Sequence, residues 1–151
     1  MKGENNMIQI RQSIFETNSS STDVFCIPSN PSLKIPKEIK MSRLMADTYC
    51  LDENASVEDK LSFMYNRAED NGNASSFIQY LAHKGINVIN DVGDTFDYDS
   101  WMFGFNMTQE NLDAFLFDSN SLYFDSPWDN HNEYERYRRI TKDFIVLNFR
   151  R

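Results

Sequence analysis

The stretch from residue 8 to residue 27 constrains the fold more than any other part of the chain. Two apolar runs rich in β-branched and aromatic residues lie on either side of a polar segment, a pattern that predicts two strands joined by a turn. The polar segment consists of Glu16, Thr17, Asn18, Ser19, Ser20, Ser21 and Thr22. Its side chains can hydrogen-bond neighbouring backbone amides. The turn is therefore either a self-satisfied structural element or a site that holds its polar groups for a ligand.

Residues 15–22 read Phe-Glu-Thr-Asn-Ser-Ser-Ser-Thr and resemble the start of a set of phage and Firmicute proteins. Those proteins begin with a short basic strand, which leads into Phe-Glu-Thr-Asn-Ser-Ser-Ser and usually Thr-His. In this chain Asp23 stands where the His is usual. The resemblance implies an origin in a phage or mobile element, and it implies no particular reaction.

The remainder of the chain predicts an α+β protein with a small, mostly antiparallel sheet packed against about three helices. Helices are expected after the N-caps Ser56 and Thr108, and a further helix ends at Gly85. Strands are expected at residues 23–27, 86–89, 122–124 and 144–149. Residues 129–141 are ambiguous, although Tyr134, Tyr137 and Ile140 have helical spacing. The N-terminal strands and the last strand are expected to be neighbours. We interpret residues 1–151 as one domain in which residues 1–6 are disordered.

The chain has two cysteines, and they lack a Cys-x-x-Cys spacing. This pattern argues against a disulfide framework and against a zinc site. The N-terminus lacks the apolar core of a signal peptide, and no stretch has the roughly 18 apolar residues that a membrane span needs. These features predict a cytoplasmic protein, here in the cytoplasm of a bacterial host.

The interval between Lys84 and Arg136 contains no Lys or Arg and is rich in aromatic residues. Its 11 acidic residues are Asp91, Asp94, Asp97, Asp99, Glu110, Asp113, Asp118, Asp125, Asp129, Glu133 and Glu135. A disordered acidic tail would lack the aromatic residues, so this acidic tract is expected to be folded. Spaced carboxylates can imitate a nucleic-acid backbone, and exposed aromatic residues can anchor an interface. An ordinary solvated acidic face is the alternative interpretation.

The acidic tract predicts a protein that binds a basic, nucleic-acid-handling host protein and inhibits or modulates it. Neither a cofactor nor direct contact with nucleic acid is expected. The predicted contact residues are Asp97, Asp99, Trp101, Asp125, Trp128 and Asp129.

The alternative is a small metal-dependent hydrolase or group-transfer enzyme. It would use the turn at residues 18–23, or the aspartates Asp91, Asp94, Asp97 and Asp99. Their spacing does not match a calcium-binding loop. Asp129, His131 and Glu133 would share one face if they lay in a strand, and would there be possible metal ligands.

Overall fold

The computed structural model describes residues 21–92 and 107–150. Residues 1–6, the strand predicted at residues 8–14 and most of the polar turn lie outside the described residues.

The described chain contains both strands and helices. In chain order the elements are β1 (Thr22–Pro28), β2 (Glu38–Lys40), α2 (Met41–Leu44), α3 (Val57–Asp70), α4 (Ala74–His83), β3 (Asn87–Ile89), α5 (Gln109–Phe117), β4 (Leu122–Asp125), the 3-10 helix η1 (Pro127–Asp129), α6 (His131–Ile140) and β5 (Phe144–Arg150). The predicted α+β class is confirmed, with a small antiparallel sheet and helices around it.

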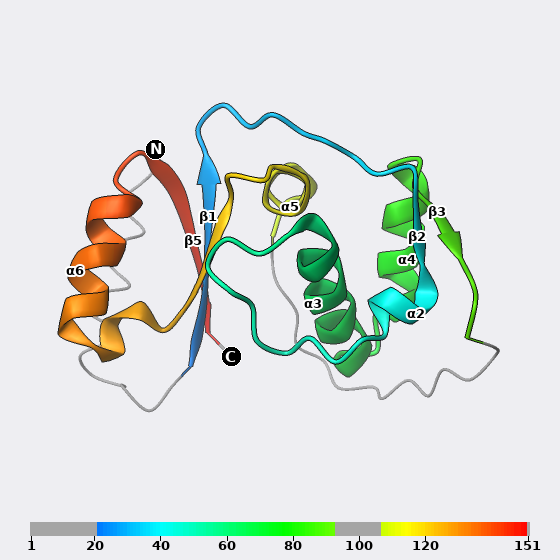
Figure 1. Cartoon of the computed structure of the whole chain (residues 1–151), viewed down its shortest axis with the longest axis horizontal. Coiled ribbons are helices and arrows are strands. Elements are labelled where there is room, and N and C mark those ends of the chain that lie inside the picture. Colours follow the sequence, from blue (N-terminus) through cyan, green and yellow to red (C-terminus); the bar gives the residue numbers. More distant parts are fainter. Residues whose placement is uncertain (1–20, 93–106, 151) are drawn as a thin grey trace.

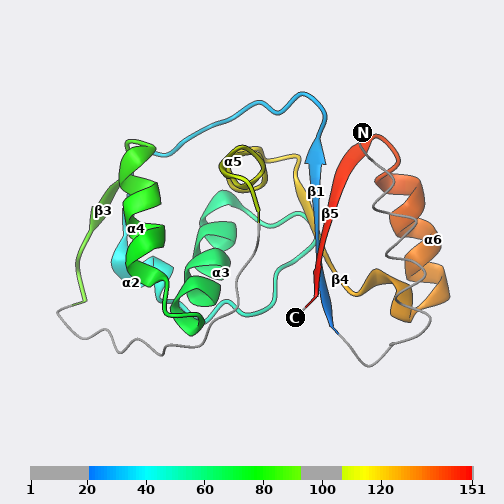
Figure 2. The same ribbon diagram turned by 180° about the vertical axis from the view of Figure 1, so that it is seen from behind.

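The central element is β1, which pairs antiparallel with β4 on one side and with β5 on the other. Phe25 lies opposite both Tyr123 and Leu147 in this register. Figures 1 and 2 show the sheet between α6 on one face and α3 with α5 on the other. The predicted adjacency of an N-terminal strand and the last strand is therefore confirmed for β1 and β5.

Alternate residues of β1 point into two different cores, because side chains along a strand alternate between the faces of the sheet. Phe25 and Ile27 belong to the larger core, where the Phe25 ring lies 4.7 Å from that of Phe115 in α5. Val24 and Cys26 belong to a smaller core that includes Tyr137 of α6. Burial on both faces explains why β1 is an almost continuous apolar run.

Two helices, α3 and α5, begin at the N-caps that the sequence predicts. Ser56 accepts a hydrogen bond from the backbone N–H of Asp59, which starts α3, and Thr108 starts α5 in the same way. At the end of α4, Gly85 has φ +81°, a left-handed conformation that glycine adopts without strain. The ambiguous region resolves into η1 and α6, and Asn130 is the N-cap of α6.

β2 and β3 form a separate two-stranded sheet that is parallel, because α2, α3 and α4 connect them. This pair and α4 lie at the opposite end of the molecule from α6 (Figures 1 and 2). Within the two described segments, no helix is long and apolar enough to cross a membrane.

Lys60 of α3 is a fully buried base that joins α3 to the end of α5. Its Nζ donates to the carbonyls of Asp118 and Ser121, each at 3.1 Å, and lies 5.1 Å from the centre of the Phe115 ring. Burial lowers the pKa of Lys60 to about 8, although the nearby Asp118 opposes this shift. The ammonium group therefore binds two carbonyls of the turn between α5 and β4.

Candidate binding site at the end of the sheet

The start of β1 carries a buried ion pair. Asp23 is 0% exposed and accepts hydrogen bonds from both terminal nitrogens of Arg67 in α3, at 2.7 Å and 3.2 Å. The hydroxyl of Tyr123 in β4 donates to the same carboxylate at 2.5 Å. Arg67 also stacks on the Phe63 ring, with 4.6 Å between its guanidinium carbon and the ring centre. Asp23 therefore joins β1, β4 and α3, which is a structural role.

Ser126 ends β4 in a strained conformation, with φ 44° and ψ 60°. Its Oγ accepts a hydrogen bond from the N–H of Thr22 at 2.9 Å, and its own N–H donates to the Thr22 carbonyl at 3.0 Å. These two bonds hold a backbone conformation that costs a non-glycine residue of the order of 1 kcal/mol. The turn directs the chain away from the sheet into η1, so that Asp125 and Asp129 lie exposed on either side of it.

A shallow groove of about 540 Å³ lies beside this turn, between β4, the start of α6 and the loop before α3. Its lining residues are Leu51, Glu53, Tyr123, Phe124, Asp125, Asn132, Glu133 and Arg136. Arg136 is the one base among them, and both of its terminal nitrogens contact Glu53, at 2.6 Å and 2.8 Å. These contacts raise the pKa of Arg136. The lining of the groove therefore carries three carboxylates, from Glu53, Asp125 and Glu133, and one guanidinium.

We call Asp125, Asp129 and Glu133 together the acidic end of the molecule. The predicted contact residues Asp125 and Asp129 are both exposed there. Trp128 is half-buried and packs against the smaller core, so that only part of its ring is available to a partner. The other predicted contacts, Asp97, Asp99 and Trp101, lie outside the described residues.

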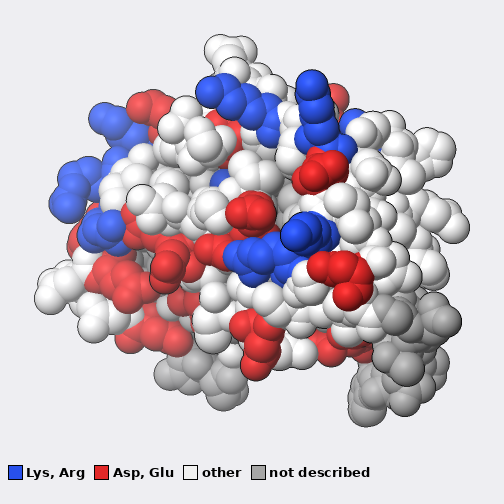
Figure 3. Space-filling view, turned by 45° about the vertical axis from the view of Figure 1, so that its right-hand side comes forward, with Lys and Arg blue, Asp and Glu red and all other residues white. Residues whose placement is uncertain are grey.

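Several other acids of the tract are engaged with groups elsewhere in the chain. Asp113 accepts hydrogen bonds from Lys84 and Tyr80, each at 2.5 Å. Burial, together with the hydrogen bond to Asp113, raises the pKa of Tyr80. Asp118 accepts from the backbone of Ser32 at 2.8 Å. Figure 3 shows acidic and basic side chains interspersed over one face. The described part of the tract is thus no uniform acidic surface, because its residues are spread over separate elements.

Of the four aspartates considered for metal-dependent chemistry, Asp91 is the one that lies within the described residues. Both carboxylate oxygens of Asp91 accept hydrogen bonds from Ser42, at 2.8 Å and 2.6 Å, and these bonds lower the pKa of Asp91. Asp94, Asp97 and Asp99 lie outside the described residues. Residues 21–92 and 107–150 contain no group of three His, Cys, Asp or Glu side chains that could hold a metal ion.

Asp129, His131 and Glu133 do not lie in a strand, because Asp129 ends η1 while His131 and Glu133 lie in α6. Residues two apart on a helix do not share a face. Of the predicted polar turn, Ser21 is exposed and Thr22 is buried as the first residue of β1, whereas Glu16, Asn18, Ser19 and Ser20 are outside the described residues.

The sequence did not predict the roles of three residues. Arg67 pairs with Asp23, and Glu53 pairs with Arg136 in the groove. Arg67 lies 44 positions from Asp23, and Arg136 lies 83 positions from Glu53. No local pattern connects such residues. The only available signal was that Arg136 is the first base after the acidic tract.

Comparisons with known proteins give no relative. A scan against protein-family models, a search of curated proteins and a search of solved structures each found no match for this chain.

Proposed function

We propose that this protein acts by binding, and that its acidic end docks onto a basic surface of a nucleic-acid-handling protein in a bacterial host. The observation that carries the proposal is the groove beside Ser126, where Asp125 and Glu133 are exposed and the one base, Arg136, is already compensated by Glu53. A partner's Lys or Arg side chains would face the three carboxylates of this lining, those of Glu53, Asp125 and Glu133.

The backbone of the acidic end supports a preorganised contact. Two hydrogen bonds to Thr22 hold the strained turn at Ser126, and the N-cap Asn130 starts α6 immediately afterwards. Acidic side chains on so constrained a segment lose little conformational freedom on binding, which favours affinity. By occupying a surface that the partner uses for nucleic acid, the protein would inhibit or modulate it, as a nucleic-acid mimic or anti-defence protein does.

The test compares the wild-type chain with the triple variant Asp125→Asn, Asp129→Asn, Glu133→Gln in affinity capture from a bacterial lysate, followed by mass spectrometry. A protein captured by the wild type is then purified and its affinity measured at several salt concentrations. Three exposed charges at about 0.5 kcal/mol each predict roughly a tenfold loss of affinity for the triple variant. Nucleic acid should compete with the wild-type chain for this partner.

The matched control changes three exposed acids elsewhere, by Asp70→Asn, Glu110→Gln and Asp143→Asn, and so removes the same charge. It should bind as the wild type does. Equal losses in the two triple variants would show a net-charge effect, and capture of no basic nucleic-acid-binding protein would overturn the proposal.

A further inference from the structure

Glu53, in the loop between α2 and α3, places a carboxylate in the groove beside the acidic end. Its backbone carbonyl accepts a hydrogen bond from the N–H of Tyr123 at 3.0 Å, which ties this part of the loop to β4. The side chain of Glu53 is 29% exposed, so a group that enters from solvent can reach it. The groove therefore contains an accessible carboxylate on a backbone that the sheet holds in place.

A guanidinium group already lies on this carboxylate. Nη1 of Arg136 lies 2.6 Å from Oε1 of Glu53, and Nη2 donates to Oε2 at 2.8 Å. Two such contacts in parallel form the bidentate arrangement that a planar guanidinium makes and a lysine ammonium cannot. The hydrogen bond and the charge of Glu53, together with the charge of Glu133, raise the pKa of Arg136. The groove thus has the stereochemistry of a guanidinium site, which its net charge alone would not show.

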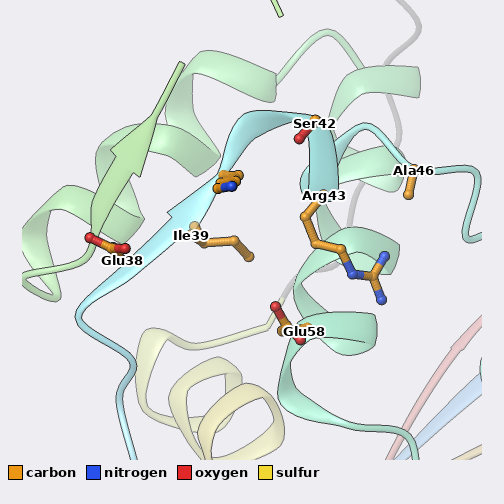
Figure 4. Close-up of a pocket in the computed structure, with 7 residues that line it drawn as sticks. Glu38, Ile39, Ser42, Arg43, Ala46 and Glu58 are labelled. Carbon is orange, nitrogen blue, oxygen red and sulfur yellow. The ribbon is translucent and has the colours of Figure 1, made fainter. Parts of the chain in front are cut away.

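Arg136 is held less firmly than Arg43, a paired arginine that lines the hollow beside β2 (Figure 4). The guanidinium of Arg43 contacts Asp59 and also donates to Ser62 at 3.2 Å, and the Ser62 hydroxyl donates to the Arg43 carbonyl at 2.7 Å. The side chain of Arg136 is 47% exposed, and within residues 21–92 and 107–150 its one hydrogen-bond partner is Glu53. An exposed pair of this kind is weak, so Arg136 can leave Glu53 at little cost in free energy.

We propose that this groove is an arginine-binding site, which Arg136 occupies in the isolated chain and from which an arginine of the partner protein displaces it. The inference rests on the proposed function, because it names the side chain by which the basic partner enters the groove. The partner's guanidinium takes the two oxygens of Glu53 and lies near Glu133, while the side chain of Arg136 extends into solvent. Arg136 is then an internal competitor that lowers the affinity of the site, and the bidentate geometry at Glu53 favours arginine over lysine.

The experiment titrates a blocked Gly-Arg-Gly peptide into the full-length chain and follows the NMR shifts of the backbone amides of Glu53 and Tyr123. The variant Arg136→Met lacks the competitor and should bind the peptide about 2- to 5-fold more tightly than the wild type, the factor that corresponds to an exposed ion pair. The matched control Arg139→Met removes an exposed base of the same helix that does not line the groove, and should bind as the wild type does. The same spectra show whether each variant keeps the fold.

Two further titrations test the chemistry of the site in the Arg136→Met background. A blocked Gly-Lys-Gly peptide should bind at least about threefold more weakly than Gly-Arg-Gly, because an ammonium cannot make both contacts with Glu53. Addition of Glu53→Gln should weaken Gly-Arg-Gly by about 3- to 10-fold. The proposal is overturned if Arg136→Met binds Gly-Arg-Gly no better than Arg139→Met, if the lysine peptide binds equally well, or if no shift in the groove saturates.

Failure of this inference and failure of the proposed function are distinguishable, because the peptide titrations use no host protein. Capture of a basic host protein together with a failed titration would overturn the arginine exchange and leave docking at the acidic end in place. A successful titration without any captured host protein would support the arginine site and overturn the proposed function alone.

Discussion

The buried ammonium of Lys60 should make the stability of this protein rise with pH in mildly alkaline solution. The pKa of Lys60 is about 8 in the folded chain against 10.5 for an ordinary lysine, so the unfolded chain binds more protons between these two values. Stability increases with pH wherever the unfolded state binds more protons. Burial of the charged form is therefore a cost that is present below pH 8 and is relieved progressively as the pH rises toward 10.5.

The size of the effect follows from the two pKa values. Linkage gives a gain of about 1 kcal/mol in the free energy of unfolding between about pH 7 and pH 9, or about 2–4 °C in the melting temperature. Cys26 acts in the opposite direction, and because its ordinary pKa is 9.0 it already reduces the Lys60 contribution by about 0.4 kcal/mol at pH 9. This leaves a net gain of about 1 kcal/mol, and Tyr80 acts in the same direction as Cys26 at higher pH. Burial raises the pKa of both above their ordinary values of 9.0 and 10.0, so that ionisation in the unfolded chain alone lowers stability there. The measurement is therefore confined to pH 9 and below.

The assay is urea unfolding, followed by circular dichroism at several pH values in this window. Lys60→Met removes the titrating group, and the gain of about 1 kcal/mol should disappear in this variant, whatever its absolute stability. Lys142→Met removes a lysine that is exposed after α6 and should keep the wild-type slope. A wild-type chain whose stability is flat or falls between pH 7 and pH 9, or a Lys60→Met variant that keeps the slope, would refute the reasoning.

Three further features of the fold can be tested by substitution. Asp23→Ala and Arg67→Met should each lower the free energy of unfolding in urea by about 3–5 kcal/mol, because each breaks a buried ion pair. The double variant should lose less than the sum of the two, and additive losses would show that the pair is not coupled. Asn130→Ala should cost about 0.5–2 kcal/mol through loss of the α6 N-cap, whereas Asn132→Ala, on the exposed side of that helix, should stay within about 0.5 kcal/mol in thermal melts. Gly85→Ala should cost about 1 kcal/mol through its positive φ alone, since the added methyl group would meet no atom within 4 Å; a neutral result would show that the backbone relaxes.

Local features of this fold were readable from the sequence. The N-caps Ser56 and Thr108, the glycine after α4 and the apolar run of β1 each depend on residues within a few positions of one another. Hydrogen bonds and side-chain periodicity over so short a distance are properties of the local chain. They determined the order of the elements and the α+β class.

The arrangement of the sites was decided only by the tertiary structure. Two-sided burial makes β1 the central strand, but its apolar pattern alone would allow several neighbours, and only packing places β4 and β5 beside it. The pairing of Asp23 with Arg67 has the same origin, since these residues are 44 positions apart. The charge of the acidic tract was visible in the sequence, but which of its carboxylates pair with a base, as Asp113 does with Lys84, was not. That depends on which bases folding brings within a few ångströms, because the energy of a charge pair depends on spatial distance and desolvation and not on separation along the chain.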